Sequence, residues 1–302
     1  MRTFVATRTF LPVLAVVVVV CTAPNPAAQG TLAREFTVFV SAVDKEGEPV
    51  EGLGPEAFIV REEGARREVL RVSHANEPID IAVLVDNSAA AQTTYSFVRT
   101  SLTKFVTAMT EGNQIAVIGL ADRPTILTDY TRDRKRLTDT VGRIFPMSQS
   151  GMTLLDAINE TSRGLRRREA PRAVMLAIVS DGAEFTNRYA KDAVKDLVDA
   201  RVAFHVATIG QFNGTTSQSE RERMFLLDQG PRASGGQRIS LLSPMALDQA
   251  LERLARELKG QYKVVYARPQ SLIAPEKIEV ASARPNVTMR GALSRGENGA
   301  RR

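Results

Sequence analysis

The sequence has 302 residues and only one cysteine, Cys21, which lies in an N-terminal segment that is expected to be removed. A chain cleaved after this residue would contain no cysteine, which would exclude disulfide bonds, thiolate zinc sites and cysteine nucleophiles. Histidine is scarce as well, since His74 and His205 are the only two. Two histidines this far apart in the sequence do not indicate a zinc site.

Motifs for nucleotide binding and serine catalysis are also missing. The sequence has no Gly-x-x-x-x-Gly-Lys-Ser/Thr phosphate loop, and no Gly-x-Gly-x-x-Gly follows its first buried apolar run. Ser88 is not surrounded by a Gly-x-Ser-x-Gly elbow, so a nucleophilic serine is not indicated. The formal charge is +6, but the arginines are scattered and no basic stripe alternates with aromatic residues. We therefore expect neither enzymatic activity nor a nucleic-acid partner.

Residues 1–30 have the pattern of a secretory signal peptide. Arg2 and Arg8 supply a positive N-terminal region, and residues 10–20 form a short apolar core. This core is shorter than the roughly 20 residues that a membrane-spanning helix needs. We expect a protein exported to the periplasm or the extracellular space, with no membrane span in the mature chain. An uncleaved anchor and a lipoprotein attached through Cys21 remain alternatives.

The remaining chain divides into three zones and a tail. Residues 79–259 alternate apolar strands with amphipathic helices, which predicts an α/β domain with a doubly wound, mostly parallel sheet. Residues 34–76 and 260–290 contain short strands, and neither zone is large enough to bury a core alone. We predict that these two zones form one small β domain around the central domain, and that residues 291–302 are a flexible tail. The strands expected in the central zone are 79–86, 114–121, 173–180 and 202–209.

Polar side chains follow two of the expected central strands. Asp86 comes directly after the apolar run 81–85, Asp181 closely follows the run 173–179, and Thr153 lies between these runs in the sequence. Ligands of parallel sheets bind beyond the carboxyl ends of the strands, so we expect these side chains to meet at one rim. Carboxylate and hydroxyl oxygens suit Mg²⁺ or a similar hard cation. The sequence therefore predicts a cation site at this rim.

These motifs make the central zone resemble the von Willebrand factor type A domain. The order, spacing and strand context of the motifs all match this family. The matching segments are Asp86-Asn87-Ser88, Gly151-Met152-Thr153-Leu154-Leu155-Asp156-Ala157-Ile158 and Ser180-Asp181-Gly182. The flanks resemble a group of exported bacterial proteins described as VWFA-related, through the segments 43–53, 58–64 and 261–266.

The resemblance implies a metal-ion-dependent adhesion site, the MIDAS of this family. Carried over by motif, its metal residues are Asp86, Ser88, Thr153 and Asp181, and the implied cofactor is Mg²⁺ or Mn²⁺. The family's first loop has a second serine, and this sequence has Ala90 in its place. Mg²⁺ prefers six oxygens in octahedral geometry, so a water would have to replace the missing hydroxyl.

Two functions follow from this interpretation. The first is an exported, non-enzymatic interaction module of the adhesion type, in which a protein partner offers a carboxylate to the bound metal. The alternative is a metal-free structural component of an envelope assembly, whose Asp86 and Asp181 bond to loop amides. Ala90 favours this alternative, because a degenerate metal site has no need of the second serine. A hydrolase that uses the acidic rim ranks behind both.

Overall fold

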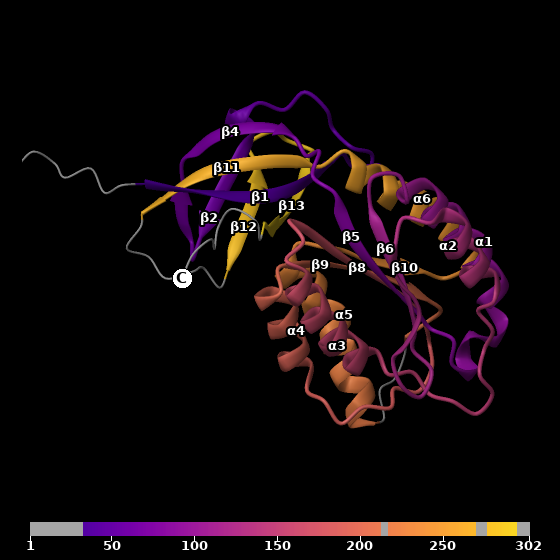
Figure 1. The fold of residues 1–302 in the computed structure, drawn as a ribbon. Coiled ribbons are helices and arrows are strands. Elements are labelled where there is room, and N and C mark those ends of the chain that lie inside the picture. The colour runs from indigo at the N-terminus through magenta and orange to yellow at the C-terminus, as the bar shows by residue number, and fades with distance from the viewer. Residues whose placement is uncertain (1–32, 213–216, 270–276, 295–302) are drawn as a thin grey trace, which may run out of the picture. The chain divides into compact units, whose positions relative to one another are not determined.

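A six-stranded, mostly parallel sheet forms the centre of the fold (Figure 1). The computed structural model describes residues 33–212, 217–269 and 277–294, so the expected signal peptide and most of the expected tail lie outside the described residues. The strand order is β10-β9-β8-β5-β6-β7, and the edge strand β7 runs antiparallel to β6. The strands are β5 (Ile79–Val85), β6 (Gln114–Gly119), β7 (Thr125–Thr131), β8 (Arg172–Ser180), β9 (Val202–Ile209) and β10 (Arg238–Leu241).

Every residue of β5, β8 and β9 is buried, as their uninterrupted apolar runs predict. Helices α1, α2 and α6 cover one face of the sheet, and α3, α4 and α5 cover the other (Figure 1). The helices are α1 (Tyr95–Met109), α2 (Arg134–Gly142), α3 (Leu154–Arg168), α4 (Ala190–Asp199), α5 (Gln218–Ser234) and α6 (Leu247–Lys259). Three short 3-10 helices are η1 (Pro55–Ala57), η2 (Ala89–Thr93) and η3 (Pro244–Ala246).

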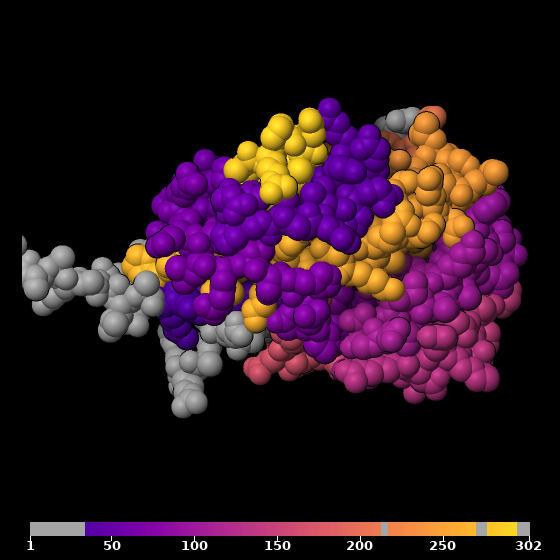
Figure 2. Space-filling view, turned by 90° about the horizontal axis from the view of Figure 1, so that it is seen from above, coloured from indigo at the N-terminus to yellow at the C-terminus, as the bar shows by residue number. Residues whose placement is uncertain are grey.

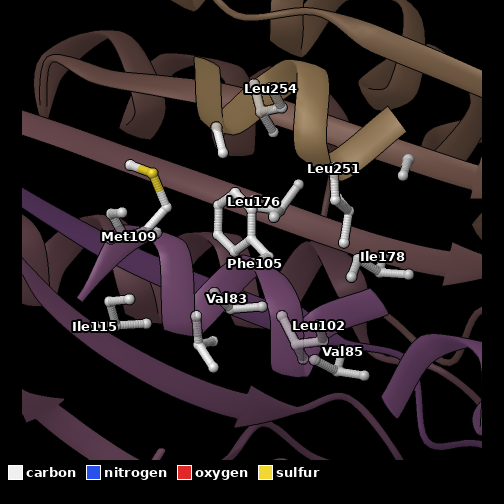
Figure 3. Close-up of a cluster of buried hydrophobic side chains, with 14 of the residues drawn as sticks. Val83, Val85, Leu102, Phe105, Met109, Ile115, Leu176, Ile178, Leu251 and Leu254 are labelled. Carbon is white, nitrogen blue, oxygen red and sulfur yellow. The ribbon is translucent and has the colours of Figure 1, made fainter. Parts of the chain in front are cut away.

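The core under α1 and α6 consists of aliphatic and aromatic side chains that are almost completely buried (Figure 3). Phe105 of α1 lies between the strands and α6, where Val83, Leu176 and Leu251 surround it. Close packing of this kind holds the strands in register, so the loops at the strand ends are carried by a rigid sheet.

Strands from the two flanks of the sequence pair with each other. In the four-stranded sheet β13-β1-β11-β4, the register places Val38 opposite Val264. The space-filling view shows C-terminal residues, in yellow, packed against N-terminal residues, in indigo (Figure 2). A second sheet has the order β12-β2-β3. The strands are β1 (Ala33–Val43), β2 (Phe58–Glu62), β3 (Ala65–Arg67), β4 (Val69–His74), β11 (Tyr262–Pro269), β12 (Ile278–Ser282) and β13 (Thr288–Leu293).

The predicted fold class, an α/β fold with a mostly parallel central sheet and small antiparallel sheets, is confirmed. Buried Arg172 joins the segments where the chain enters and leaves the central sheet. Its guanidinium donates to Glu77 O at 2.9 Å and to Leu258 O at 2.7 Å. Burial lowers the pKa of Arg172 to about 10, so the group stays charged at neutral pH. Among the described residues, no helix is long and apolar enough to cross a membrane.

Candidate metal and partner-binding site

Four loops meet at the carboxyl end of the central sheet. Met152 holds two of them together, because its N–H donates to Ala183 O at 2.9 Å and its carbonyl accepts from Phe185 N at 2.7 Å. The neighbouring Gly151 carbonyl accepts from Asp122 N at 2.9 Å, which adds the loop after β6. Ala89 N donates to Ser150 O at 3.3 Å, which adds the loop of Asp86 and Ser88. The backbone therefore brings the loops of all four predicted site residues to one rim.

Asp86 is fixed by two backbone donors. Its Oδ1 accepts from Ser88 N at 2.9 Å, and its Oδ2 accepts from Ser180 N at 3.0 Å. The side chain is almost completely buried. Each carboxylate oxygen keeps a lone pair after these bonds, so the group can still accept a further partner. Asp86 thus ties the end of β5 to the end of β8 whether or not a cation binds.

Thr153 precedes α3, and its side chain is directed to the end of β6. Its Oγ1 donates to Leu120 O at 2.8 Å, which leaves the oxygen lone pairs available to a cation. Asn87 supports the same strand end, since its Oδ1 accepts from the N–H groups of Leu120 and Ala121 at 2.9 Å each. The sequence motif contains Asn87, but its role as a loop anchor was not predicted.

Ser88 is buried, and its backbone N–H donates to Asp86 Oδ1 at 2.9 Å. A methyl group at Gly182 would lie 2.4 Å from Ala90 Cβ and 3.9 Å from Ser88 Oγ. The methyl of Ala90 therefore faces the loop of Asp181. Gly182 is required here because any side chain would collide with that methyl.

Asp181 faces a buried arginine that sequence reasoning missed. Its Oδ1 lies 3.6 Å from a guanidinium nitrogen of Arg223, and the Asp181 side chain is 40% exposed. Arg223 comes from α5 and also donates to the carbonyl of Gly182. Its guanidinium lies over the ring of Phe212. A positive charge therefore already lies beside the acidic rim, and its position in a distant helix gave no local sequence signal.

Glu184 is a second residue that sequence reasoning missed. Its Oε1 accepts from Leu155 N at 3.2 Å, and its Oε2 is buried without a partner in the described residues. Burial raises the pKa of Glu184 to about 8, because desolvation penalises the ionised form. The carboxylate of nearby Asp156 accepts from Thr186 Oγ1 at 2.8 Å and pairs with Arg188.

The predicted donors form a set that can accept a hard cation. Asp86 offers free lone pairs, buried Ser88 carries a hydroxyl in the same loop, and Thr153 Oγ1 lies at the same rim. In residues 33–212, 217–269 and 277–294, no group of three or more His, Cys, Asp or Glu side chains is placed to hold a metal. The donor set therefore depends on hydroxyls as much as on carboxylates.

The sequence comparisons agree with this geometry. Residues 81–184 match the family model of the von Willebrand factor type A domain. This segment is a von Willebrand factor type A domain. The resemblance drawn from the motifs is thereby confirmed, and the matched residues include three of the four rim loops. No curated protein sequence matches the chain.

Solved structures with a similar fold come from several bacteria. A D319A mutant of the PilB minor pilin from Streptococcus sanguinis is 9% identical, with a TM-score of 0.46, and the match covers 62% of each chain. The chain therefore spans less than two thirds of that pilin. The vWF domain of the type V pili tip protein Mfa5 from Porphyromonas gingivalis is 11% identical, with a TM-score of 0.47, covering 61% of this chain and 96% of that one. BatB from Bacteroides thetaiotaomicron is 16% identical, with a TM-score of 0.47, covering 60% and 99%.

Proposed function

We propose that the chain is an exported, non-enzymatic interaction module that binds a protein partner at the rim formed by the carboxyl ends of the central strands. The observation that carries this proposal is the distribution of exposed apolar side chains. Of the eleven large apolar side chains that are exposed in the described residues, six lie in the rim segments 145–147, 185–189 and 242–245. They are Phe145, Met147, Phe185, Tyr189, Leu242 and Met245.

Exposed apolar side chains gathered around a polar centre are typical of a binding surface. Two hydrogen bonds place the segment of Met147 at this centre. Met147 N donates to Asn87 O at 2.8 Å, and Ala89 N donates to Ser150 O at 3.3 Å. A partner that covers these side chains would exclude water from the carboxylates and hydroxyls between them, which strengthens any ionic contact made there.

We further propose that this centre holds Mg²⁺ or Mn²⁺. Asp86, Ser88 and Thr153 would hold the ion directly or through water, and Asp181 would hold a coordinated water. When bound, the ion supplies a positive site that a carboxylate of the partner can ligate. The free lone pairs of Asp86 and the hydroxyl of buried Ser88 in the same loop support this assignment.

A second candidate function is a metal-free structural component of an envelope assembly. Two observations favour it: the Ala90 methyl replaces a family hydroxyl, and the guanidinium of Arg223 lies beside Asp181. On this alternative, partners bind through the same apolar rim, but binding does not depend on a cation.

Calorimetric titration of the purified protein with Mg²⁺ and Mn²⁺ separates the two candidates. We expect saturable binding that Asp86→Ala abolishes and that Asp129→Ala, an exposed acid on β7, leaves unchanged. A null response in the unaltered protein would contradict the metal site. Capture of envelope proteins is then compared with and without chelator, using Phe185→Asp as the rim variant. Capture that resists chelator but is lost in Phe185→Asp supports the metal-free component, and capture that Phe185→Asp leaves intact contradicts the rim altogether.

A further inference from the structure

A charged cavity lies at the opposite end of the central sheet, where β10 begins. Its volume is about 320 Å³. It is lined by the turn after β1, the first residues of β10, one face of α6 and the start of β13. Segments from the N-terminal flank, the central domain and the C-terminal flank therefore share one cavity. It lies at the opposite end of the sheet from the rim proposed to bind a partner.

Basic side chains dominate the polar lining of this cavity. The basic residues are Lys45, Arg238, Arg253 and Arg290, and the acidic ones are Asp44, Glu46 and Glu257. Only Arg290 of the basic group forms an ion pair within the described residues, at 2.8 Å from Glu257 Oε2.

The lining has four basic residues and three acidic ones, and Asp228 and Glu48 outside it interact with Arg238 and Arg253. The Asp44 carboxylate accepts the N–H groups of Glu46 and Glu48 in its own turn, at 3.0 and 2.8 Å. Glu46 is exposed to solvent. Glu257 is therefore the only buried carboxylate of the lining, whereas Arg238, Arg253 and Arg290 are all partly buried. Like charges gathered in a partly desolvated cavity repel one another, so the lining favours an added anion.

Unpaired polar atoms are concentrated around this cavity. Twelve buried side-chain nitrogen and oxygen atoms lack a hydrogen-bond partner in the described part of the chain, and three of them belong to residues that line this cavity. They are Arg238 Nε, Arg290 Nε and Glu257 Oε1. Buried polar groups without partners are costly, and the two arginine nitrogens require a guest that accepts hydrogen bonds.

We propose that this cavity binds a small phosphate group, either inorganic phosphate or the phosphate of a small organic molecule, through Arg238, Arg253 and Arg290. Guanidinium groups pair with phosphate oxygens through parallel N–H donors, which makes arginine the preferred residue for such groups. The volume accommodates a compact anion of this kind. A bound phosphate supplies the acceptors that the two buried Nε atoms lack and neutralises the excess positive charge. It also links the C-terminal flank, through Arg290, to the central domain, so it stabilises the folded chain by mass action.

The test is calorimetric titration of the purified protein with phosphate at constant ionic strength, balanced with chloride. We expect saturable binding that Arg238→Gln and Arg253→Gln each weaken by about tenfold or more, because each variant removes a charged donor. Arg163→Gln, which removes the same charge from an exposed position on α3, is the matched control and should bind as the unaltered protein does. Arg253→Lys, which keeps the charge, should bind more weakly than the unaltered protein and more tightly than Arg253→Gln.

A comparison of two phosphate compounds in the same titration identifies the source of the phosphate. Tighter binding of glycerol phosphate than of inorganic phosphate assigns the site to an organic phosphate, and the reverse order assigns it to the free ion. The proposal is overturned if no saturable binding occurs, if both cavity variants bind as tightly as the unaltered protein, or if Arg163→Gln weakens binding equally. Succinate that binds as tightly as phosphate also overturns the assignment, because a dicarboxylate would then satisfy the site. Circular dichroism confirms that each variant is folded.

Discussion

The two ends of the central sheet hold their polar groups in opposite ways. At the carboxyl end, a backbone N–H bonds to each oxygen of the buried Asp86 carboxylate. At the amino end, Arg238, Arg290 and Glu257 carry buried atoms that no side chain or backbone group of the described residues satisfies. The Asp86 carboxylate is therefore preorganised before a ligand arrives, whereas the arginine cluster at the amino end would be completed by the proposed phosphate. Substitutions at the carboxyl end should alter the geometry of the loops, and substitutions at the amino end should alter the balance of charge.

Arg172 provides the strongest test of this contrast, since it is a buried cation at the amino end that is well bonded. Its four acceptors include Ala75 O at 3.2 Å and Gln261 Oε1 at 2.7 Å. Arg172→Met should lower the free energy of unfolding by about 3 kcal/mol or more, because the buried carbonyls lose a charged donor. Chemical denaturation measures this change. Arg167→Met, at an exposed position on α3, should change stability by less than about 0.5 kcal/mol. Equal effects of the two substitutions would show that Arg172 does not link the flanks.

The contact between Gly182 and Ala90 tests the geometry of the rim. Gly182→Ala places a methyl 2.4 Å from Ala90 Cβ, so the free energy of unfolding should fall by about 1–3 kcal/mol through overpacking. Ala90→Gly in the same chain removes the colliding methyl and should recover most of the loss. Denaturation of both single variants and the double variant gives the interaction energy between the positions. Additive effects would mean that the two residues are not in contact.

The sequence predicted most accurately the elements whose apolar pattern lies within one short segment. The expected strand 173–180 agrees with β8 (Arg172–Ser180) to within one residue. An unbroken apolar run of this length is typical of a strand that is buried on both faces of a sheet. The edge strand β7 (Thr125–Thr131) is not among the strands that the pattern predicted for the central zone. Most of its side chains are exposed, so the sequence has no apolar run that would mark the ends of this strand.

The parts of the two sites that the sequence did not reveal come from packing between distant segments. Arg223 reaches the rim from α5, and nothing in its neighbourhood in the sequence marks it as a partner of Asp181. Arg238, Arg253 and Arg290 come from three different elements, so their convergence is visible only in the fold. The rim was recognisable because its residues directly follow buried strands, where topology alone brings them together.

Glu184 makes the stability of the carboxyl end depend on pH. Its pKa is about 8 in the folded protein, against 4.5 for the unperturbed group. Between these values the folded state retains a proton that the unfolded state has released, so stability falls as the pH rises from about 5 to about 8. Glu184→Gln cannot titrate and should flatten this part of the curve. Denaturation across the pH range measures it, and parallel curves for the two proteins would rule out a buried, protonated Glu184.

His205 gives the amino end the opposite response. Burial lowers the pKa of His205 to about 4, against 6.5 for the unperturbed group. Between these values the unfolded state binds a proton that the folded state excludes, so stability falls as the pH drops from about 6.5 to about 4. The interval is narrower than that of Glu184, so the effect on the free energy of unfolding should be smaller. His205→Phe should remove it in the same denaturation series. A loss of the same size in the variant would assign the acid response to carboxylates instead.

The smallest expected effect concerns Ala90, the position where the rim departs from its family. Ala90→Ser restores a hydroxyl beside Ser88 and Gly182, and it should tighten Mg²⁺ or Mn²⁺ binding about fivefold to tenfold, which corresponds to about 1 kcal/mol. Ala89→Ser, at the exposed neighbouring position, is the matched control and should leave the affinity unchanged. Calorimetry on both variants decides the point. If Ala90→Ser binds metal no more tightly than the unaltered protein does, the hydroxyl at this position is not a ligand, and the preorganised rim binds its partner without depending on the family's full coordination sphere.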